Sequence, residues 1–146
     1  MIDTPFSAMA TEFRGQIIKI WSLKTSGNAT EKSRILCQKA IEFELVERAK
    51  PIPGTALIHW SKTSPSYTPL WAAQSALLLL LTNGWKPSNH VEWCGMASLF
   101  QRLYKKTNLA EMLSYLPQQI NKDIAAGWIV AAIEEDVNFR RNKKRK

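Results

Sequence analysis

The feature that most constrains the fold is the apolar run over residues 70–81, LWAAQSALLLLL. Among its twelve residues only Gln74 and Ser75 are polar, and a helix that is apolar on nearly every side has to be buried. The run is also well short of the ~20 residues that a membrane-spanning helix needs. We therefore predict that it is the buried central helix of a bundle, and we expect Leu79→Asp to unfold the domain.

Capping signals predict two helices before this run. Thr4 followed by Pro5 has the pattern of an N-cap with proline at the first helical position, and that helix is expected to end near residues 26–27, where a glycine can take a left-handed C-cap. Asn28 and Glu31 have the spacing of a capping box. They are expected to open a helix over residues 28–50, which ends where prolines forbid its continuation.

A long irregular stretch and two further helices flank the apolar run. Residues 51–69 contain four prolines, and within them residues 55–60 fit either a short strand or one helical turn. Thr68 and Pro69 are expected to cap the helix over residues 70–82. Apolar side chains at helical spacing then predict a helix over about 90–106.

Two helices are expected at the end of the chain. Asn108 and Glu111 form a second capping-box pair, and Pro117 is expected to lie in the first turn of the last helix. The whole pattern predicts an all-α fold, a helical bundle of about five to six helices, with residues 1–139 as one domain and residues 140–146 as a basic C-terminal tail.

The cysteines and the N-terminus favour a reducing compartment. Cys37 and Cys94 both fall in predicted helices and are expected to be buried thiols rather than a disulfide. The first residues, MIDTPF, have neither the cationic nor the apolar region of a secretory signal. We therefore expect a cytoplasmic protein that does not enter a membrane.

The sequence shows no catalytic pattern. It has two histidines and neither a phosphate-binding glycine-rich loop nor a nucleophile elbow. His90 and Cys94 are four residues apart and can share a helix face, but a tetrahedral metal site needs two more ligands, so a helix-start histidine beside a core cysteine is the favoured interpretation. The acidic residues 134–136 are expected to be a solvated face. We expect no enzyme activity, no metal and no cofactor.

The charge of the chain is concentrated at its end. The formal net charge is +8, and six of the last seven residues are cationic, so residues 1–139 have a formal charge of only +2. A basic chain of this kind is expected to meet an anionic partner. Five of these six cations are expected to assist a nucleic-acid surface on the body, and they are Arg140, Arg141, Lys143, Lys144 and Arg145.

Candidate contacts on the body come from three segments. The helix over 28–50 has Lys32, Arg34 and Lys39 in its first half, which is the reverse of what the helix dipole favours, so an anionic partner is expected there. The cations near the end of the helix over 90–106 have two interpretations, which are equally supported. They either interact favourably with the helix dipole or contact phosphates of a partner. Those cations are Arg102, Lys105 and Lys106.

The third segment is the proline-rich stretch, where Lys62 follows His59 and Trp60. Aromatic side chains next to a cation can stack on unpaired bases. The favoured alternative is that Trp60 folds this stretch onto the core. Because no clean recognition helix is found, we expect contacts with the backbone of single strands or of an RNA–DNA heteroduplex rather than sequence reading.

A small basic all-α chain without catalytic residues resembles the small subunits of class 1 CRISPR (Cascade-type) effector complexes. Residues 108–137, NLAEMLSYLPQQINKDIAAGWIVAAIEEDV, resemble the helical C-terminal region of the large subunit in cyanobacterial-type complexes. The resemblance implies a bundle that stacks in several copies beside other subunits and contacts target or displaced DNA without nuclease activity. This family has no fixed functional residues to transfer.

Two other functions remain open. The first is a helical adaptor in phage or plasmid DNA replication, of the helicase loader or inhibitor type, which would use exposed tryptophans among the six of this chain. The second is a small enzyme with an unrecognised site.

Overall fold

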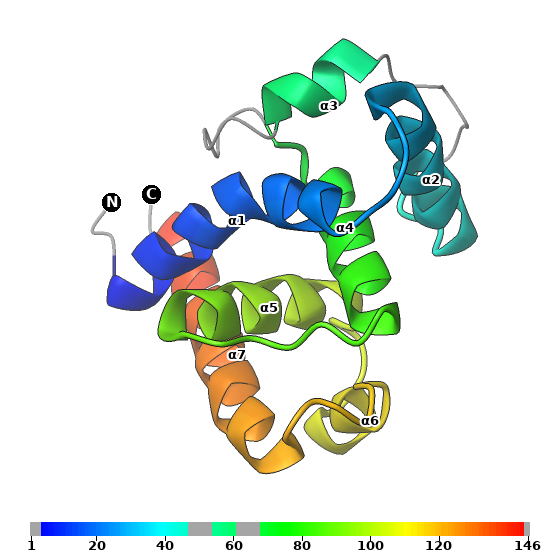
Figure 1. Cartoon of the computed structure of the whole chain (residues 1–146). Coiled ribbons are helices and arrows are strands. Elements are labelled where there is room, and N and C mark those ends of the chain that lie inside the picture. Colours follow the sequence, from blue (N-terminus) through cyan, green and yellow to red (C-terminus); the bar gives the residue numbers. More distant parts are fainter. Residues whose placement is uncertain (1–3, 47–53, 61–67, 145–146) are drawn as a thin grey trace.

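The computed structural model describes residues 4–46, 54–60 and 68–144. Within these ranges the chain forms seven α-helices and no strand, which confirms the predicted all-α bundle (Figure 1). The helices are α1 (Pro5–Leu23), α2 (Ala29–Glu42), α3 (Gly54–Trp60), α4 (Leu70–Thr82), α5 (His90–Leu103), α6 (Leu109–Ser114) and α7 (Lys122–Lys144).

Helix α4 is the central element, as the apolar run predicts. It packs against α1, α2 and α5, and most of its side chains are buried. Its polar Ser75 is also fully buried, and the hydroxyl donates to the carbonyl of Leu36 in α2 at 2.7 Å. Leu79 is only half-buried, whereas Leu77 is fully buried. A buried charge is therefore expected to unfold the domain at Leu77 rather than at Leu79.

Helices α1 and α5 make the most extensive contact in the described part of the chain. Gly95 allows this close approach, because a Cβ atom at that position would lie 2.1 Å from Cδ2 of Phe13. Phe13 is fully buried and stacks on Trp85, with the ring centroids 6.0 Å apart. The backbone of α5 therefore forms part of the surface on which the Phe13 ring rests.

Three of the predicted N-caps are confirmed. The side chain of Thr4 accepts from the backbone N–H of Ser7, and those of Asn28 and Asn108 accept from the N–H three residues further on. Each side chain satisfies one of the backbone donors that a helix start leaves unpaired. The chain has a further cap of this kind at the start of α5, where Asn89 accepts from the N–H of Glu92.

The predicted cap of α4 is wrong. Pro69 occupies the N-cap position, and no side chain makes a capping hydrogen bond there. The hydroxyl of Thr68 is buried and has no hydrogen-bond partner among the described residues. The sequence pattern Thr-Pro thus marks the start of both α1 and α4, but it caps only α1.

Several predicted boundaries are also wrong. Helix α1 ends at Leu23, before Gly27, although Gly27 does have a positive φ of 111°. Helix α2 ends at Glu42 because Glu44 adopts a left-handed φ of 57°. Helix α5 ends at Leu103 rather than at residue 106. Residues 55–60, which were open between strand and helix, belong to α3.

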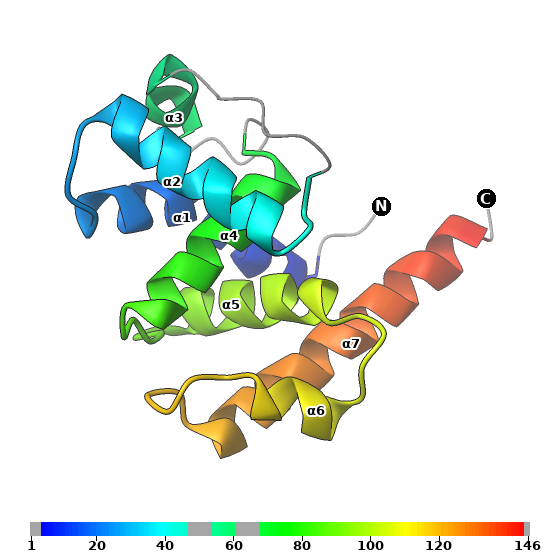
Figure 2. The ribbon, with the colours of Figure 1, turned by 90° about the vertical axis from the view of Figure 1, so that its right-hand side faces the viewer.

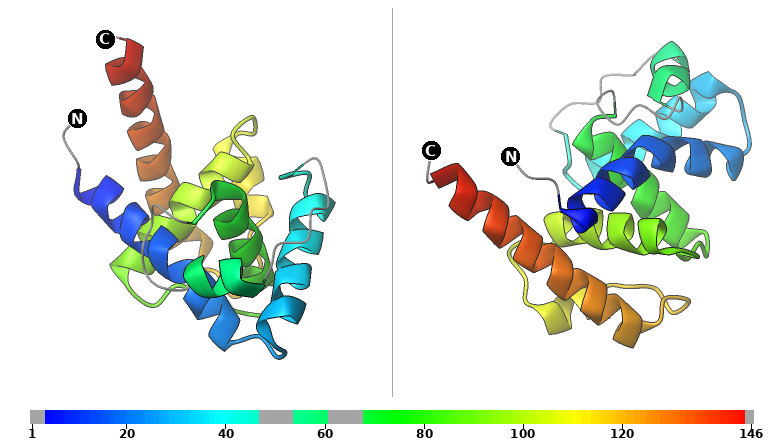
Figure 3. Two further views of the ribbon diagram at one scale, coloured as in Figure 1. Left: turned by 90° about the horizontal axis from the view of Figure 1, so that it is seen from above. Right: turned by 90° about the vertical axis from the view of Figure 1, so that its left-hand side faces the viewer.

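The last helix begins later and extends further than the sequence indicates. It starts at Lys122, where Asn121 accepts from the N–H of Ile124, and not at Pro117. Its backbone stays helical to Lys144, so the expected domain boundary at residue 139 falls inside one continuous helix. Figures 2 and 3 show its last turns extending past the rest of the bundle, on the side where α1 begins.

Among the described residues, no helix combines the length and the apolar character that crossing a bilayer requires.

Candidate functional site

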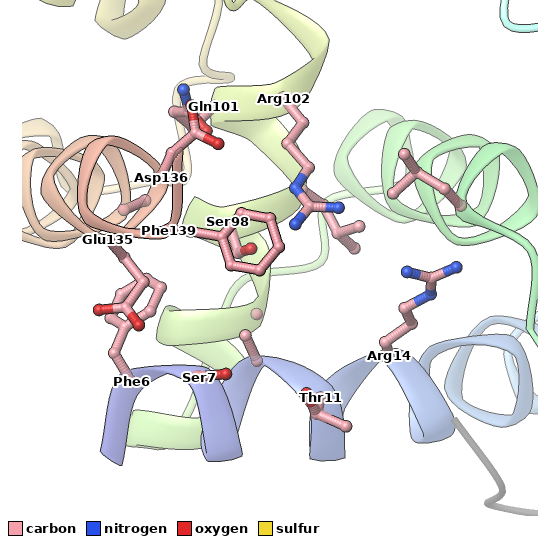
Figure 4. Close-up of a pocket in the computed structure, with 15 residues that line it drawn as sticks. Phe6, Ser7, Thr11, Arg14, Ser98, Gln101, Arg102, Glu135, Asp136 and Phe139 are labelled. Atoms are coloured by element: carbon pink, nitrogen blue, oxygen red, sulfur yellow. The ribbon is translucent and has the colours of Figure 1, made fainter. Parts of the chain in front are cut away.

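A pocket of about 190 Å³ lies between α1, α5 and α7, close to the start of α4 (Figure 4). One wall is polar and comes from α1 and α5, and the α7 side contributes carboxylates and an aromatic ring. The polar wall consists of Ser7, Thr11, Arg14, Ser98, Gln101 and Arg102. The α7 side consists of Ala132, Glu135, Asp136 and Phe139.

Arg14 is held in place by the loop before α4. Its Nε and Nη2 atoms donate to the carbonyl oxygen of Thr68 at 3.0 and 2.8 Å. The guanidinium is half-buried. Burial lowers the pKa of Arg14, and the positive charge of Arg102 lowers that pKa further. Arginine nevertheless stays protonated in proteins, so this pocket contains a fixed positive charge.

Arg102 provides the second guanidinium of the pocket. It lies on α5, it is exposed, and it makes no hydrogen bond or ion pair with any described residue. Figure 4 shows both guanidinium groups on the same side of the pocket, with Glu135 on the opposite side. Two cations therefore lie near each other, and neither forms an ion pair with a described carboxylate.

Glu135 is engaged elsewhere. The hydroxyl of Thr4 donates to its Oε1 at 2.6 Å, and the same hydroxyl accepts from the N–H of Ser7. Thr4 thus caps α1 and links it to α7. This bond orients the Glu135 carboxylate toward the start of α1 rather than toward the arginines.

Cys94 and His90 do not share a site. Cys94 is fully buried, and its Sγ donates to the carbonyl of Phe6 at 3.1 Å. His90 is exposed, and its ring lies 5.7 Å from the ring of Trp128, centroid to centroid. In the described ranges no three potential metal-ligating side chains come together. The expected buried thiols are confirmed for Cys94 and Cys37, since both are buried and neither is in a disulfide.

The chemical state of Cys94 follows from its burial. Burial raises the pKa of the Cys94 thiol to about 12 from a usual value near 9, and the charge of Glu135 adds to the rise, against a lowering by the backbone of Ala10. A thiol with this pKa stays protonated at physiological pH. The thiolate is the nucleophile in cysteine chemistry, so Cys94 is a core residue and not a catalytic one.

The raised pKa predicts a loss of stability in alkali. The unfolded chain releases the Cys94 proton from about pH 9, whereas the folded chain keeps it until about pH 12. Between these values the free energy of unfolding is expected to fall by about 1.4 kcal/mol per pH unit from this group. Urea unfolding between pH 8 and 11 measures the slope. Cys94→Ala is expected to remove the contribution of this thiol to the slope. An equal slope in both proteins would contradict the raised pKa of Cys94.

The predicted cationic patch on α2 is not formed. Lys32 donates from Nζ to the carbonyl and the hydroxyl of Ser22 at 2.7 and 3.2 Å, at the C-terminal end of α1. Cations are favourable there, so local stability does explain Lys32, contrary to the sequence argument. Lys39 is half-buried and lies 3.8 Å from Glu42, and Arg34 lies ~160° around the helix from Lys32.

The cations near the end of α5 are exposed, and only Arg102 is on the helix itself. Lys105 and Lys106 follow in the turn after Leu103. Arg102 lines the same pocket as Arg14, which the sequence does not mark as a candidate contact. No local pattern marks Arg14, because its partner belongs to a helix far along the chain.

The remaining predicted residues divide into two groups. Lys62 and Arg145 lie outside the described residues. Four others follow Phe139 directly on the last turns of α7, and they are Arg140, Arg141, Lys143 and Lys144. Because Phe139 lines the pocket, this basic segment begins at the pocket's edge.

The tryptophans are structural. Trp60 is half-buried and packs edge-on against Trp71, with centroids 5.8 Å apart, so Trp60 itself packs against the core, as predicted. Each of the six tryptophans is buried or half-buried. The exposed tryptophans expected for an adaptor protein are therefore absent.

Comparisons of the chain with protein-family models, with curated proteins and with solved structures find no match.

Proposed function

We propose that this protein binds the phosphate backbone of single-stranded nucleic acid or of an RNA–DNA heteroduplex and does so without catalysis. One observation supports this most strongly. Arg14 and Arg102 line the same pocket as Phe139, and the basic segment of α7 continues from Phe139. A pair of guanidiniums and an exposed aromatic ring thus line one pocket, and four cationic residues follow this ring in the sequence of the same helix.

Helix stability accounts for only part of this charge. Cations in the last turns of α7 interact favourably with its dipole, so the basic segment alone is weak support for a ligand. The pairing of Arg14 with Arg102 is different, because two like charges in a partly buried pocket destabilise the folded protein. An anionic partner compensates this cost, and phosphates are anions that arginine binds with two donors at once.

The narrower proposal is that the protein is a small subunit of an RNA-guided CRISPR effector complex in the cytoplasm. It would contact target or displaced DNA and stack in several copies beside other subunits. The resemblance of residues 108–137, which form α6 and most of α7, supports this narrower proposal. The replication-adaptor alternative loses its main support, because two of the six tryptophans are buried and the other four are half-buried against the core.

The test is fluorescence anisotropy of labelled single-stranded DNA across a salt series. We expect the chain with Arg102, Lys105 and Lys106 all changed to glutamine to bind roughly a hundredfold more weakly at about 0.1 M salt. The slope of log affinity against log salt should become shallower by about 2, since each phosphate contact on a single strand adds about 0.7. A chain ending at Phe139 is expected to bind more weakly but to keep a clear salt slope.

The matched control removes the same amount of charge elsewhere. Lys19, Lys24 and Lys86 are exposed and do not line the pocket, so changing all three to glutamine should leave the slope nearly unchanged. Equal losses of DNA affinity in both triple variants would show a general electrostatic attraction rather than binding at a defined site. If the full chain fails to bind DNA at low salt, the proposal is wrong.

A further inference from the structure

We infer that the pocket between α1, α5 and α7 binds a phosphate monoester, with the phosphate between Arg14 and Arg102 and an aromatic body against Phe139. This goes beyond binding of a backbone, because a phosphodiester has one negative charge and a monoester has close to two at neutral pH. The ligand is either a free nucleoside monophosphate or the phosphorylated end of a strand. Both present the same chemical group.

The charges favour a dianion. Arg14 is fixed by its two bonds to Thr68, and its remaining donors are available on the pocket side (Figure 4). Arg102 lies on the same side of the pocket and makes no ion pair with a described carboxylate. Two guanidiniums match the two charges of a monoester, and each can make a charge-assisted pair with the phosphate oxygens. Hydroxyl groups of Ser7, Thr11 and Ser98 also line the pocket and are able to donate.

The size and the aromatic ring favour a nucleotide. The pocket volume of about 190 Å³ is below the roughly 300–1,000 Å³ of sites for drug-sized ligands, so the ligand has to be small or extend out of the pocket. The Phe139 ring lies over the middle of the pocket and is 49% exposed (Figure 4). A base that leaves the pocket can stack on this ring.

The carboxylates limit the number of phosphates. Glu135 and Asp136 line the α7 side, away from the two arginines. A second or third phosphate that reached this side would meet like charges, which is unfavourable at short range. The pocket is therefore expected to prefer a monophosphate to a triphosphate, although the triphosphate has the larger total charge.

The direct test is calorimetric titration of the full chain with AMP, adenosine, ATP and inorganic phosphate at one fixed ionic strength. We expect AMP to bind at least tenfold more tightly than adenosine and more tightly than ATP. Arg102→Gln should weaken AMP binding at least tenfold. Lys24→Gln removes one positive charge from an exposed position that does not line the pocket and should leave AMP binding unchanged. AMP binding that is absent, or equal in these two variants, overturns the inference.

A second measurement locates the ligand. Addition of AMP should shift the backbone amide signals of Thr11, Gly95 and Ser98, which line the pocket. Arg14→Gln is a second variant for the same titration, with folding checked by circular dichroism. Shifts confined to the last turns of α7 would place the nucleotide on the basic segment and contradict a site in the pocket.

Two oligonucleotides separate the possible sources of the phosphate. A strand with a 5′-phosphate should compete with AMP, and the same strand with a 5′-hydroxyl should not, if the pocket holds strand ends. Competition by neither strand would assign the pocket to a free nucleotide. AMP binding does not depend on backbone binding, so the DNA salt series and this titration can fail separately.

Discussion

Gly95→Ala is expected to lower the free energy of unfolding by about 3 kcal/mol, near the upper end of what overpacking usually costs. The added methyl group would lie 2.1 Å from the buried Phe13 ring. The ring has no room to withdraw, because it is fully buried and stacked on Trp85. Thermal unfolding followed by circular dichroism should show a midpoint lower by about 10 °C.

Gly127→Ala is the matched control. Gly127 lies on the exposed side of α7, and a Cβ atom there meets nothing within 4 Å. Alanine is the better helix former, so this variant is expected to gain about 0.5–1 kcal/mol. A double variant with Phe13→Leu should recover part of the Gly95→Ala loss, because the ring that the methyl group meets is gone. Additive effects would show that the clash is not with Phe13.

Leu77→Asp is expected to abolish folding. Leu77 is fully buried in α4, where a carboxylate has neither water nor a cation to pair with. The loss of apolar burial and the cost of the polar group together reach several kcal/mol, which is comparable to the whole stability of a small domain. The measurement is far-ultraviolet circular dichroism of the purified protein, with size-exclusion chromatography to detect aggregation.

Leu79→Asp tests whether burial or the charge itself is responsible. Leu79 is two residues away on the same helix and half-buried, so its aspartate can reach solvent. We expect this variant to stay helical and monomeric, with a loss of about 1–2 kcal/mol. If the two variants behave alike, α4 is not oriented as described.

The central helix could be predicted because its sequence leaves no alternative. Residues 70–82 are apolar on nearly every side, and only the interior accommodates such a helix. The caps at Asn28 and Asn108 could be predicted because a cap is a local hydrogen bond, three residues long. Both kinds of prediction rely on interactions that the sequence displays directly.

The missed boundaries depend on distant contacts. Gln119 donates from Nε2 to the carbonyls of Leu81 and Trp85 at 2.8 and 3.0 Å, so the segment after Pro117 closes the end of α4 rather than beginning α7. The early end of α2 at Glu42 has no glycine to mark it, because Glu44 takes the left-handed conformation instead. Neither event leaves a signal in the local sequence.

Of the two arginines in the candidate site, only Arg102 could be predicted, because the contact that brings Arg14 to the pocket is also distant in the sequence. Arg102 is visible as part of a cationic cluster, whereas Arg14 is a lone arginine on an amphipathic helix. The fold brings the two together, and the hydrogen bonds from Arg14 to Thr68 are formed across 54 residues of sequence. The sequence therefore shows that the chain is basic, and only the structure shows that Arg14 and Arg102 line one pocket.

The hydrogen bond between Thr4 and Glu135 has a consequence for synthesis on the ribosome. The two residues are 131 positions apart, and the contact of Cys94 with Phe6 spans 88. Helix α1 is made before α4, α5 and α7, against which it packs. Part of its apolar face therefore stays uncovered until these helices have been made, and such surfaces can aggregate in that interval. The described bundle is complete only after α7 has been made.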